Sequence, residues 1–321
     1  MNAALCSRYG DASALTVGKT PVPKRRAGEL LIQVHASSIN PVDWKILRGD
    51  LRVIFGRKPP QILGGDFAGI VLEAGENDRF KVGDKVWGLT EIRKFRSTPG
   101  AHAQITRCAS HIVDHMPTNL TFTEAGTLPL VALTAFQSLV HHAHLKAGES
   151  VLINGCSGGV GTVAIQLAKA LGANVTGVCS GANKSLALEL GCNQVIDYKT
   201  SNLLACTDRF DVWFDVVGHH SLRTVRHQLK PKGTYINIVK LLSTRLSGFL
   251  NPLRQRSSHA VFVAPDADDL AQLRTHLEQG AIKAVIDTVY PLDDIASAYT
   301  HNRTHRVVGK LAVTMNQSIP S

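Results

Sequence analysis

The sequence predicts an α/β protein that combines a partly open β-barrel with a doubly wound parallel sheet. Three observations carry this prediction. The first third of the 321 residues is rich in short strand-like runs between Gly and Pro residues. From about Thr121 onward, strand-like and helix-like segments alternate, which is typical of βαβ units. A glycine-rich turn joins the first apolar strand of that part to a helix.

The barrel prediction depends on the strands of the first third. The segments 30–35 and 69–73 cluster or alternate residues that favour strands, and Lys81 to Gly88 has the pattern of a turn leading into a strand. Short strands joined by such turns are typical of a partly closed barrel.

The alternating part opens with a helix predicted over 122–135, with Thr121 or Thr123 as its cap and Glu124 in its first turn. The segment 240–258 mixes basic and apolar residues and receives no assignment. The remaining expected strands are 150–154, 173–179, 195–196, 210–217, 233–239 and 261–264, and the remaining expected helices are 159–171, 185–190, 221–229, 266–279 and 292–300.

The composition is that of a globular protein with a basic surface. Hydrophobic residues make up 44% of the chain and charged residues 19%. Lys and Arg number 35 and Asp and Glu 25, a net charge of +10. Such an excess can serve nucleic acid, an anionic membrane or an anionic ligand. The basic residues are scattered in short clusters, so we do not expect a nucleic-acid site.

The cysteine spacing and the first residues of the chain bear on the cellular compartment of the protein. Six cysteines show no CxxC spacing, so we expect free thiols in a reducing compartment. No apolar signal core follows Met1, and no apolar run is long enough to span a bilayer. We therefore expect a protein without a membrane span in the cytoplasm, although some organelle proteins are addressed without a cleaved presequence.

The most informative stretch is the glycine-rich turn at 155–161, which follows an apolar strand and opens a helix. Gly158 would let the backbone approach a pyrophosphate, and Gly161 would let the helix pack against the strand. The helix N-terminus supplies free N–H groups and the positive end of the helix dipole. The glycine spacing departs from the standard GxGxxG, so the dinucleotide prediction depends on the flanking strand and helix. The alternative is an ordinary Gly-rich turn.

The end of the second strand bears on the choice between NADPH and NADH. An NAD site usually places Asp or Glu there, to bond the ribose 2′-hydroxyl. This chain has Ser180 and Lys184 there instead, and Glu189, well inside the next helix, is the first carboxylate. A hydroxyl and a cation suit the 2′-phosphate of NADPH. The alternative is a solvated loop with an accidental lysine.

These residues resemble the zinc-independent quinone oxidoreductase branch of the medium-chain dehydrogenase/reductase superfamily. The match runs nearly from end to end and is specific to the branch, though not to one substrate. The matching motifs are N-P-V-D-W-K at 40–45, G-D-F-A-G at 65–69, P-L-V-A-L-T-A at 129–135, the glycine loop at 154–161, Q-L-A-K at 166–169, V-I-D-Y at 195–198, D-V-V-G at 215–218, V-I-D at 285–287 and G-K at 309–310.

The resemblance implies a fold and a reaction. It implies a GroES-like catalytic domain from residues 1–123 and 265–321, with a Rossmann domain at 124–264 inserted between its halves. Cofactor and substrate would meet in the cleft. The expected reaction is hydride transfer from NADPH to a quinone or an α,β-unsaturated carbonyl, and a homodimer is common in the family.

The resemblance also implies cofactor-binding residues. Thr134 would contact the nicotinamide, and Val239 would lie near its carboxamide. Gly218 belongs to the same predicted cofactor site. The residues expected to hold the pyrophosphate are Ser157, Gly158, Gly159, Val160 and Gly161, and those expected around the adenosine phosphate are Ser180, Lys184 and Tyr198.

No metal site is expected. The zinc-dependent relatives carry a Cys and a Gly-His-Glu where this chain has 40–43 and 65–67, and the four-cysteine zinc loop is missing. His141, His142 and His144 could bind a stray transition metal, but an exposed helix end is the favoured interpretation.

Without a metal, hydrogen-bond donors or water must meet the charge that develops on the acceptor oxygen. By analogy, Asn40 and Lys45 are the best-placed donors, and Asp43 or Asp66 would orient them. The alternative, of nearly equal weight, is that these polar residues only fix the loop structure. Quinones and conjugated enones need less activation than ketones, because the incoming charge delocalises. An acid is therefore dispensable.

The chain departs from the family pattern in places that bear on substrate range. Cys156 stands where Ala is common, His102 where Tyr is common, and His219-His220 follow Gly218. The rival function is an NADPH-binding redox sensor or RNA-binding protein with little turnover, which the net charge keeps open. A panel of quinone and enone acceptors, with salt-dependent RNA retention as control, would discriminate between the two.

Overall fold

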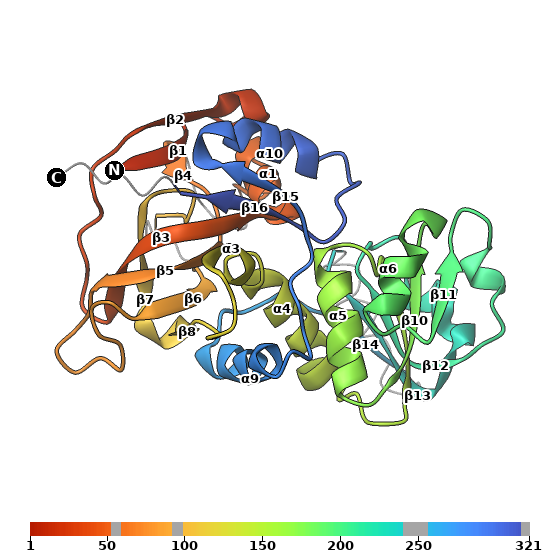
Figure 1. Ribbon diagram of the computed structural model, residues 1–321. Helices are drawn as coiled ribbons and strands as arrows, with labels where there is room; N and C mark the ends of the chain where they lie inside the picture. The colour runs from red at the N-terminus through yellow and green to blue at the C-terminus, as the bar shows by residue number, and fades with distance from the viewer. Residues whose placement is uncertain (53–58, 92–98, 240–255, 316–321) are drawn as a thin grey trace. The chain divides into compact units, whose positions relative to one another are not determined.

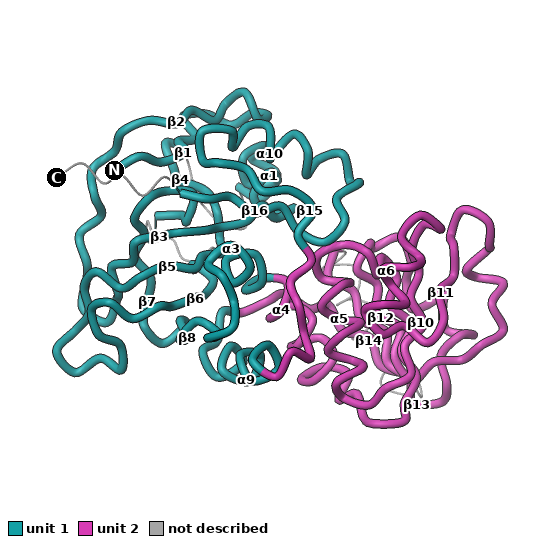
Figure 2. Tube along the Cα trace, viewed as in Figure 1, with its two compact units in different colours: residues 1–130, 265–278, 286–321 teal, residues 131–264, 279–285 magenta. Residues whose placement is uncertain are grey.

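A computed structural model describes residues 1–52, 59–91, 99–239 and 256–315 of the chain. The fold comprises two compact units (Figure 2). Unit 1 consists of residues 1–130, 265–278 and 286–321, and unit 2 of residues 131–264 and 279–285. The domain boundaries expected from the sequence stay a prediction. All six cysteines are free thiols, and five of them are buried.

Unit 1 is built on a seven-stranded sheet and a smaller three-stranded sheet (Figure 1). The central strand of the large sheet is β3 (Glu29–Ile39), which pairs antiparallel with β5 (Asp66–Glu73), β7 (Ile105–Ala109) and β16 (Lys310–Thr314). The sheet continues through β6 (Lys85–Leu89) and β8 (Val113–His115), and β15 (Ile286–Pro291) forms its other edge. The small sheet contains β1 (Asn2–Cys6), β2 (Leu15–Lys19) and β4 (Gln61–Ile62).

Among the described residues, four α-helices lie wholly in unit 1, and α1 (Pro41–Arg48) carries part of the predicted site. Its ends follow from local chemistry. Pro41 starts the helix, where its missing N–H costs no hydrogen bond, and Gly49 ends it in the left-handed region with φ 82°. The other three are α3 (Phe122–Ala125), α9 (Ala267–Glu278) and α10 (Ile295–Asn302).

The core of unit 2 is a six-stranded parallel sheet in the order β11-β10-β9-β12-β13-β14. This is the doubly wound sheet that the sequence predicts. The strands are β9 (Ser150–Asn154), β10 (Asn174–Cys179), β11 (Gln194–Asp197), β12 (Phe210–Asp215), β13 (Leu229–Asn237) and β14 (Ser257–Ala260). The helices are α5 (Gly159–Ala170), α6 (Lys184–Glu189) and α7 (Leu222–Val225), and α4 (Pro129–Phe136) leads into the unit.

Alternating side chains of the parallel strands pack on opposite faces of the sheet. Leu152, Trp213 and Tyr235 belong to one buried cluster with Leu222 and Val225 of α7. Their strand neighbours point to the other face, because successive residues of a strand alternate. Helix α5 packs against β9 and β10.

Two sequence expectations differ clearly from the structure. The helix predicted over 122–135 is broken into α3 and α4, because Gly126 ends the first and Pro129 starts the second. The last strand expected at 261–264 lies earlier, at β14. Within the segment left unassigned, residues 240–255 lie outside the described residues. Among the described residues, no helix is long and apolar enough to cross a membrane.

Candidate functional site

Most predicted cofactor-binding residues follow directly on the carboxyl ends of the strands of unit 2. Because all six strands are parallel, these ends lie along one edge of the sheet. The positions are residues 157–161 after β9, Ser180 and Lys184 after β10, Tyr198 after β11, Gly218 after β12 and Val239 after β13. Thr134 stands apart from this set, buried in α4.

The glycines of the loop after β9 differ in what a side chain at each position would contact. A Cβ at Gly161 would lie 2.2 Å from the backbone oxygen of Gly155, so only glycine lets α5 start this close to the strand. A Cβ at Gly158 would find no atom nearer than 3.7 Å. Contacts within the described chain therefore require glycine at position 161 but not at position 158. A ligand close to the backbone at Gly158 would supply the missing reason.

The first turn of α5 presents unused donors. Its N-cap is Gly158, which has no side chain with which to cap the helix. Within the described chain, the backbone N–H groups of Gly159, Val160 and Gly161 have no hydrogen-bond partner. Three free N–H groups at the positive end of a twelve-residue helix form a site suited to an anion such as a pyrophosphate.

The loop after β10 is tied to the glycine loop. The side-chain amide of Asn183 donates to the hydroxyl of Ser157 over 3.1 Å. Lys184 is exposed and, within the described chain, forms no ion pair or hydrogen bond. Ser180 is half-buried, and its side chain caps no N–H group of the following turn. A hydroxyl and an unpaired cation are thus available beside the glycine loop.

A buried carboxylate, Asp215, organises the middle of the same edge. Its Oδ1 accepts from Asn154 Nδ2 and the backbone N of Gly218, each over 2.9 Å. Its Oδ2 accepts from the backbone N of His220 over 3.0 Å and from Tyr235 Oη over 3.2 Å. Asp215 therefore joins the ends of three strands and holds the turn that contains Gly218. Sequence reasoning did not single it out as a site residue.

Apolar side chains lie exposed along this edge. Tyr198, Val217 and Val239 are 58%, 39% and 43% exposed, and each directly follows a parallel strand within two residues. Val239 packs against Gly218, where a Cβ would stand 2.6 Å from that of Val239. Exposed apolar groups beside unused donors are typical of a surface that a ligand covers.

In unit 1 the structure brings together Asn40, Asp43 and Asp66, three of the four predicted catalytic residues. The Asn40 amide donates to Asp66 Oδ2 over 2.7 Å, and its backbone N donates to Asp43 Oδ2 over 2.8 Å. Lys310 joins the group, with its Nζ donating to Asn40 Oδ1 and lying 3.4 Å from Asp66 Oδ2. At most 5% of any of these four residues is exposed.

Asp66 is saturated with donors. Besides Asn40 and Lys310, its carboxylate accepts from Ser38 Oγ over 2.5 Å and from the backbone N of Leu130 over 2.7 Å. Burial raises the pKa of Asp43 to about 7 and lowers that of Lys310, because removal from water disfavours both charged forms. These contacts favour the alternative in which Asn40, Asp43 and Asp66 fix local structure. Their catalytic roles stay a prediction.

Lys45 lies outside this network. Its Nζ stands 5.6 Å from the ring centroid of Trp44, and the side chain is half-buried. Of the four predicted catalytic residues, Lys45 is the one whose charged group does not belong to the network.

Sequence reasoning gave no catalytic or binding role to two further buried residues of unit 1. Lys310 was noted only as part of a family motif, and the signal that could have found it is a lysine at the start of an apolar strand. His102 is fully buried, with Nε2 3.1 Å from the backbone oxygen of Ser38 and Nδ1 3.3 Å from Tyr299 Oη. Both of its ring nitrogens are used, so this departure from the family pattern lies in the core.

The described residues do not fit a metal ion. They contain no group of three or more His, Cys, Asp or Glu side chains placed to hold one. His142 instead packs its ring against His259, with centroids 5.3 Å apart.

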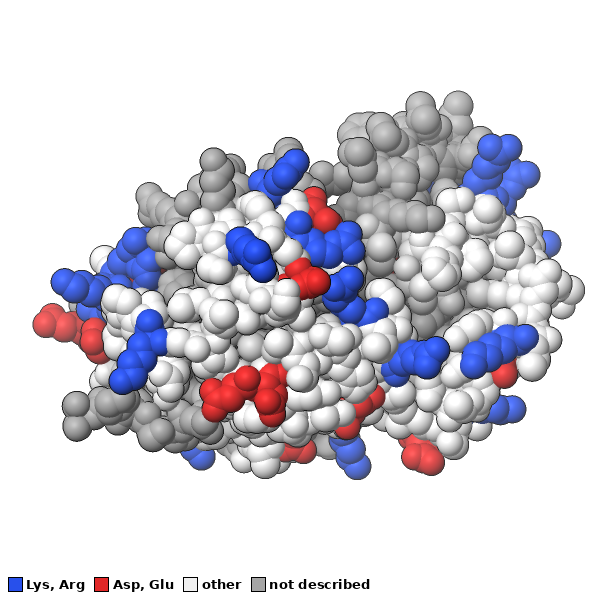
Figure 3. Space-filling view, turned by 90° about the horizontal axis from the view of Figure 1, so that it is seen from above, with Lys and Arg blue, Asp and Glu red and all other residues white. Residues whose placement is uncertain are grey.

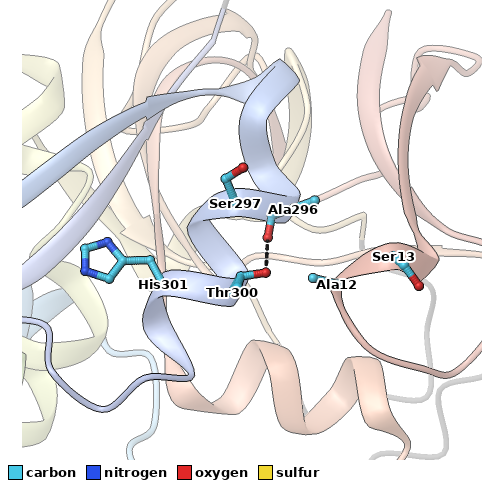
Figure 4. A pocket seen from close by; sticks show the side chains of 6 residues that line it. All are labelled: Ala12, Ser13, Ala296, Ser297, Thr300 and His301. Atoms are coloured by element: carbon cyan, nitrogen blue, oxygen red, sulfur yellow. Dashed lines mark hydrogen bonds between the residues drawn. The ribbon is translucent and has the colours of Figure 1, made fainter.

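Two surface features lie away from the predicted site. A shallow hollow of about 510 Å³ between the turn at Ala12–Ala14 and α10 contains none of the predicted residues (Figure 4). Its lining hydroxyl at Thr300 donates to Ala296 O over 2.9 Å, and Ser13 Oγ donates to Asp11. On the face shown in Figure 3, Lys and Arg side chains stand in small separate groups with Asp and Glu among them, as expected for a generally basic surface.

Two family models match the chain. Residues 26–128 match the alcohol dehydrogenase GroES-like domain, and residues 190–313 match the family described as zinc-binding dehydrogenase. The second description is a family name, and the described residues of this chain lack the ligands that it suggests.

Relatives match the chain over most of its length. A zinc-type alcohol dehydrogenase-like protein of Schizosaccharomyces pombe is 35% identical over 89% of this chain and 86% of its own. A chloroplastic quinone-oxidoreductase homolog of Spinacia oleracea is 31% identical over 98% of both chains. A mitochondrial NAD(P)H oxidoreductase of Bos taurus is 33% identical over 89% of this chain and 82% of its own.

The solved structure of the quinone oxidoreductase from Coxiella burnetii covers 98% of this chain and 99% of its own, with a TM-score of 0.89 and 28% identity. The fold is therefore a GroES-like domain with a parallel Rossmann sheet, as predicted, and the protein is an NAD(P)H-dependent oxidoreductase. The chain belongs to the zinc-independent quinone oxidoreductase branch of the medium-chain dehydrogenase/reductase superfamily.

Proposed function

We propose that this protein transfers hydride from NADPH to a quinone or an α,β-unsaturated carbonyl, without a metal ion. The observation that carries the proposal is the set of unpartnered groups at the carboxyl edge of the sheet in unit 2. Within the described chain, three backbone N–H groups of α5 have no partner and could bind one anion, and the unpaired Lys184 could bind a second. The 2′-phosphate and pyrophosphate of NADPH supply two anions.

The residues present fit this cofactor. A Cβ at Gly158 would meet no atom nearer than 3.7 Å, so the space against this backbone is open for a phosphate. Asn183 donates to Ser157, so the two loops that would contact the pyrophosphate and the adenosine phosphate are linked. Val239 and Gly218 would face the nicotinamide half. Thr134 completes the predicted set from α4.

When bound, NADPH supplies the hydride, and the protein has to orient it and to accommodate charge on the acceptor. Conjugated acceptors delocalise that charge, so one donor or a water suffices. Lys45 is the predicted catalytic residue whose cation lies outside the buried network of unit 1. We therefore assign the acceptor side to Lys45, with Asn40, Asp43 and Asp66 holding α1 and β5 in place.

The direct test is oxidation of NADPH, followed by its absorbance, against a panel of quinones and conjugated enones in the presence of a chelator. We expect turnover with at least one conjugated acceptor and none with simple ketones. RNA retention that falls with salt, without turnover of any acceptor, would favour the rival function as an RNA-binding protein. Turnover abolished by the chelator and restored by zinc would refute the metal-free reaction.

A cytoplasmic location and a homodimer stay predictions.

The preference for NADPH should depend on Lys184. A charge-assisted hydrogen bond contributes about 1.5–3 kcal/mol, so Lys184→Ala should weaken NADPH by about ten- to a hundredfold and leave NADH nearly unchanged. The measurement is the Michaelis constant for each cofactor. Lys146→Ala is the matched control, because this exposed lysine precedes β9 and lies at the opposite edge of the parallel sheet. Equal loss for both cofactors would contradict the role of Lys184.

A further inference from the structure

The sequence places no carboxylate near the end of the second strand, but the fold brings one there. Asp197 is the last residue of β11, and in the parallel register it lies opposite Cys179, the last residue of β10. Ser180 follows Cys179 directly. Asp197 therefore stands beside the loop that contains Ser180 and Lys184, although it is far from both in sequence.

The carboxylate of Asp197 lies against the backbone of this loop. Its Oδ2 is 2.6 Å from the point that a Cβ on Gly181 would occupy, so glycine at 181 makes room for the carboxylate. Its Oδ1 accepts from the backbone N of Lys199 over 2.9 Å, which holds the side chain in place.

One oxygen of this carboxylate is unused. Within the described residues, Oδ2 has no hydrogen-bond donor, and Asp197 forms no ion pair. The residue is half-buried, whereas the neighbouring Gly181 and Tyr198 are exposed. A fixed negative charge with an unsatisfied oxygen thus faces the same loop as the unpaired Lys184.

We propose that Asp197 is a specificity-determining residue that limits the preference for NADPH over NADH. The proposal rests on the proposed function, because it needs the adenosine ribose to lie at the 180–184 loop. There the carboxylate repels a 2′-phosphate and can accept a hydrogen bond from the ribose hydroxyl of NADH. Lys184 acts in the opposite sense, so the two charges together set the cofactor ratio.

The test is to measure the dissociation constants of NADPH and NADH by calorimetry for the wild-type protein and for Asp197→Asn. Asparagine keeps the shape and an acceptor for Lys199 N but loses the charge. We expect NADPH to bind about three- to tenfold more tightly and NADH to bind equally or more weakly, as two like charges several ångströms apart near a surface would dictate. High salt should reduce the gain.

The matched control is Asp208→Asn. Asp208 is an exposed carboxylate that precedes β12, so it lies at the amino edge of the sheet, away from the loop. The substitution changes the net charge of unit 2 by the same amount as Asp197→Asn and should leave the dissociation constants of NADPH and NADH unchanged. Asp197→Ser, which also removes the charge and keeps an acceptor, guards against a folding defect specific to asparagine.

The outcomes separate the two proposals. The cofactor ratio is the dissociation constant of NADH divided by that of NADPH, and it rises when NADPH binds more tightly. If Lys184→Ala weakens NADPH but both Asp197 variants leave this ratio unchanged or lower it, the role of Asp197 is refuted and the proposed function stands. If Lys184→Ala affects neither cofactor, or the protein binds neither, the adenosine site is elsewhere and both proposals fail. A rise in the ratio for Asp208→Asn as large as that for Asp197→Asn would refute a local effect.

Discussion

In unit 1 the polar side chains at Asn40, Asp43 and Asp66 bond to one another and to Lys310. In unit 2, by contrast, the first three N–H groups of α5 and the Lys184 side chain have no partner within the described chain. The first set is buried and the second contains exposed groups such as Lys184. The roles of Asn40, Asp43 and Asp66 were predicted from the family resemblance, whereas those of the glycine loop and Lys184 were predicted first from the strand, turn and helix pattern.

The difference indicates what each set contributes. A buried polar group that already has its partners stabilises the fold, and losing a partner costs free energy of unfolding. A group without a partner contributes little until a ligand arrives, and losing it costs affinity. We therefore expect substitutions in the unit 1 network to lower stability, and substitutions along the unit 2 edge to lower cofactor binding. Three predictions test this division.

The largest effect should follow from Lys310→Met. Removal of the cation leaves the Asp66 carboxylate buried without its ion pair, and breaking one partner of such a pair typically costs about 3–5 kcal/mol. The measurement is the free energy of unfolding in urea. Lys45→Met is the control, because that cation is half-buried outside the network, and it should cost less than about 1 kcal/mol. Equal losses in the two variants would show that the network is not structural.

The second-largest effect should be a change in the pH dependence of stability when Asp43 is replaced. Burial raises the pKa of Asp43 from 3.8 to about 7, so between these values the unfolded chain releases a proton that the folded chain keeps, and stability falls as pH rises. Burial lowers the pKa of His102 from 6.5 to about 4, so over nearly the same window stability falls as pH drops. The two slopes oppose each other.

Asp43→Asn removes one of these slopes and leaves the other. The free energy of unfolding of the variant should therefore rise with pH between about 4 and 7 more steeply than that of the wild type, by about 2–4 kcal/mol across the window. Urea titrations at several pH values measure this. Asp208→Asn, at an exposed site, should leave the slope unchanged. A parallel profile for Asp43→Asn would mean that this carboxyl titrates alike in the folded and unfolded chain.

The smallest expected effect on stability comes from replacing glycines of the loop after β9, and it should differ between Gly161 and Gly158. Gly161→Ala brings a methyl group against Gly155 O and should cost about 1–3 kcal/mol of unfolding free energy, together with cofactor affinity. Gly158→Ala has open space and should cost less than about 1 kcal/mol, yet weaken NADPH and NADH alike because the methyl stands in the phosphate position. Undiminished binding in Gly158→Ala would place the pyrophosphate elsewhere.

Much of the fold could be predicted because its signals are local. The strand at 150–154 was predicted at its observed bounds, and the helix after the glycine loop within one residue. Apolar periodicity and the glycine turn each act within a few residues. The predicted helix over 122–135 failed where periodicity was given more weight than Gly126 and Pro129, which break it.

The sequence by itself determined the alternation of strands and helices in unit 2, the glycine loop and the absence of a carboxylate in the 180–184 loop. Only the tertiary structure decided that Lys310 would meet Asn40, because the antiparallel pairing of Leu311 with Ile39 places them side by side across 270 positions of the chain. It likewise decided that Asp197 would lie beside Gly181, through the parallel register of β10 and β11. Strand periodicity and turn chemistry are properties of neighbouring residues, whereas the pairing of distant strands depends on which apolar faces are buried together, and this no local pattern specifies.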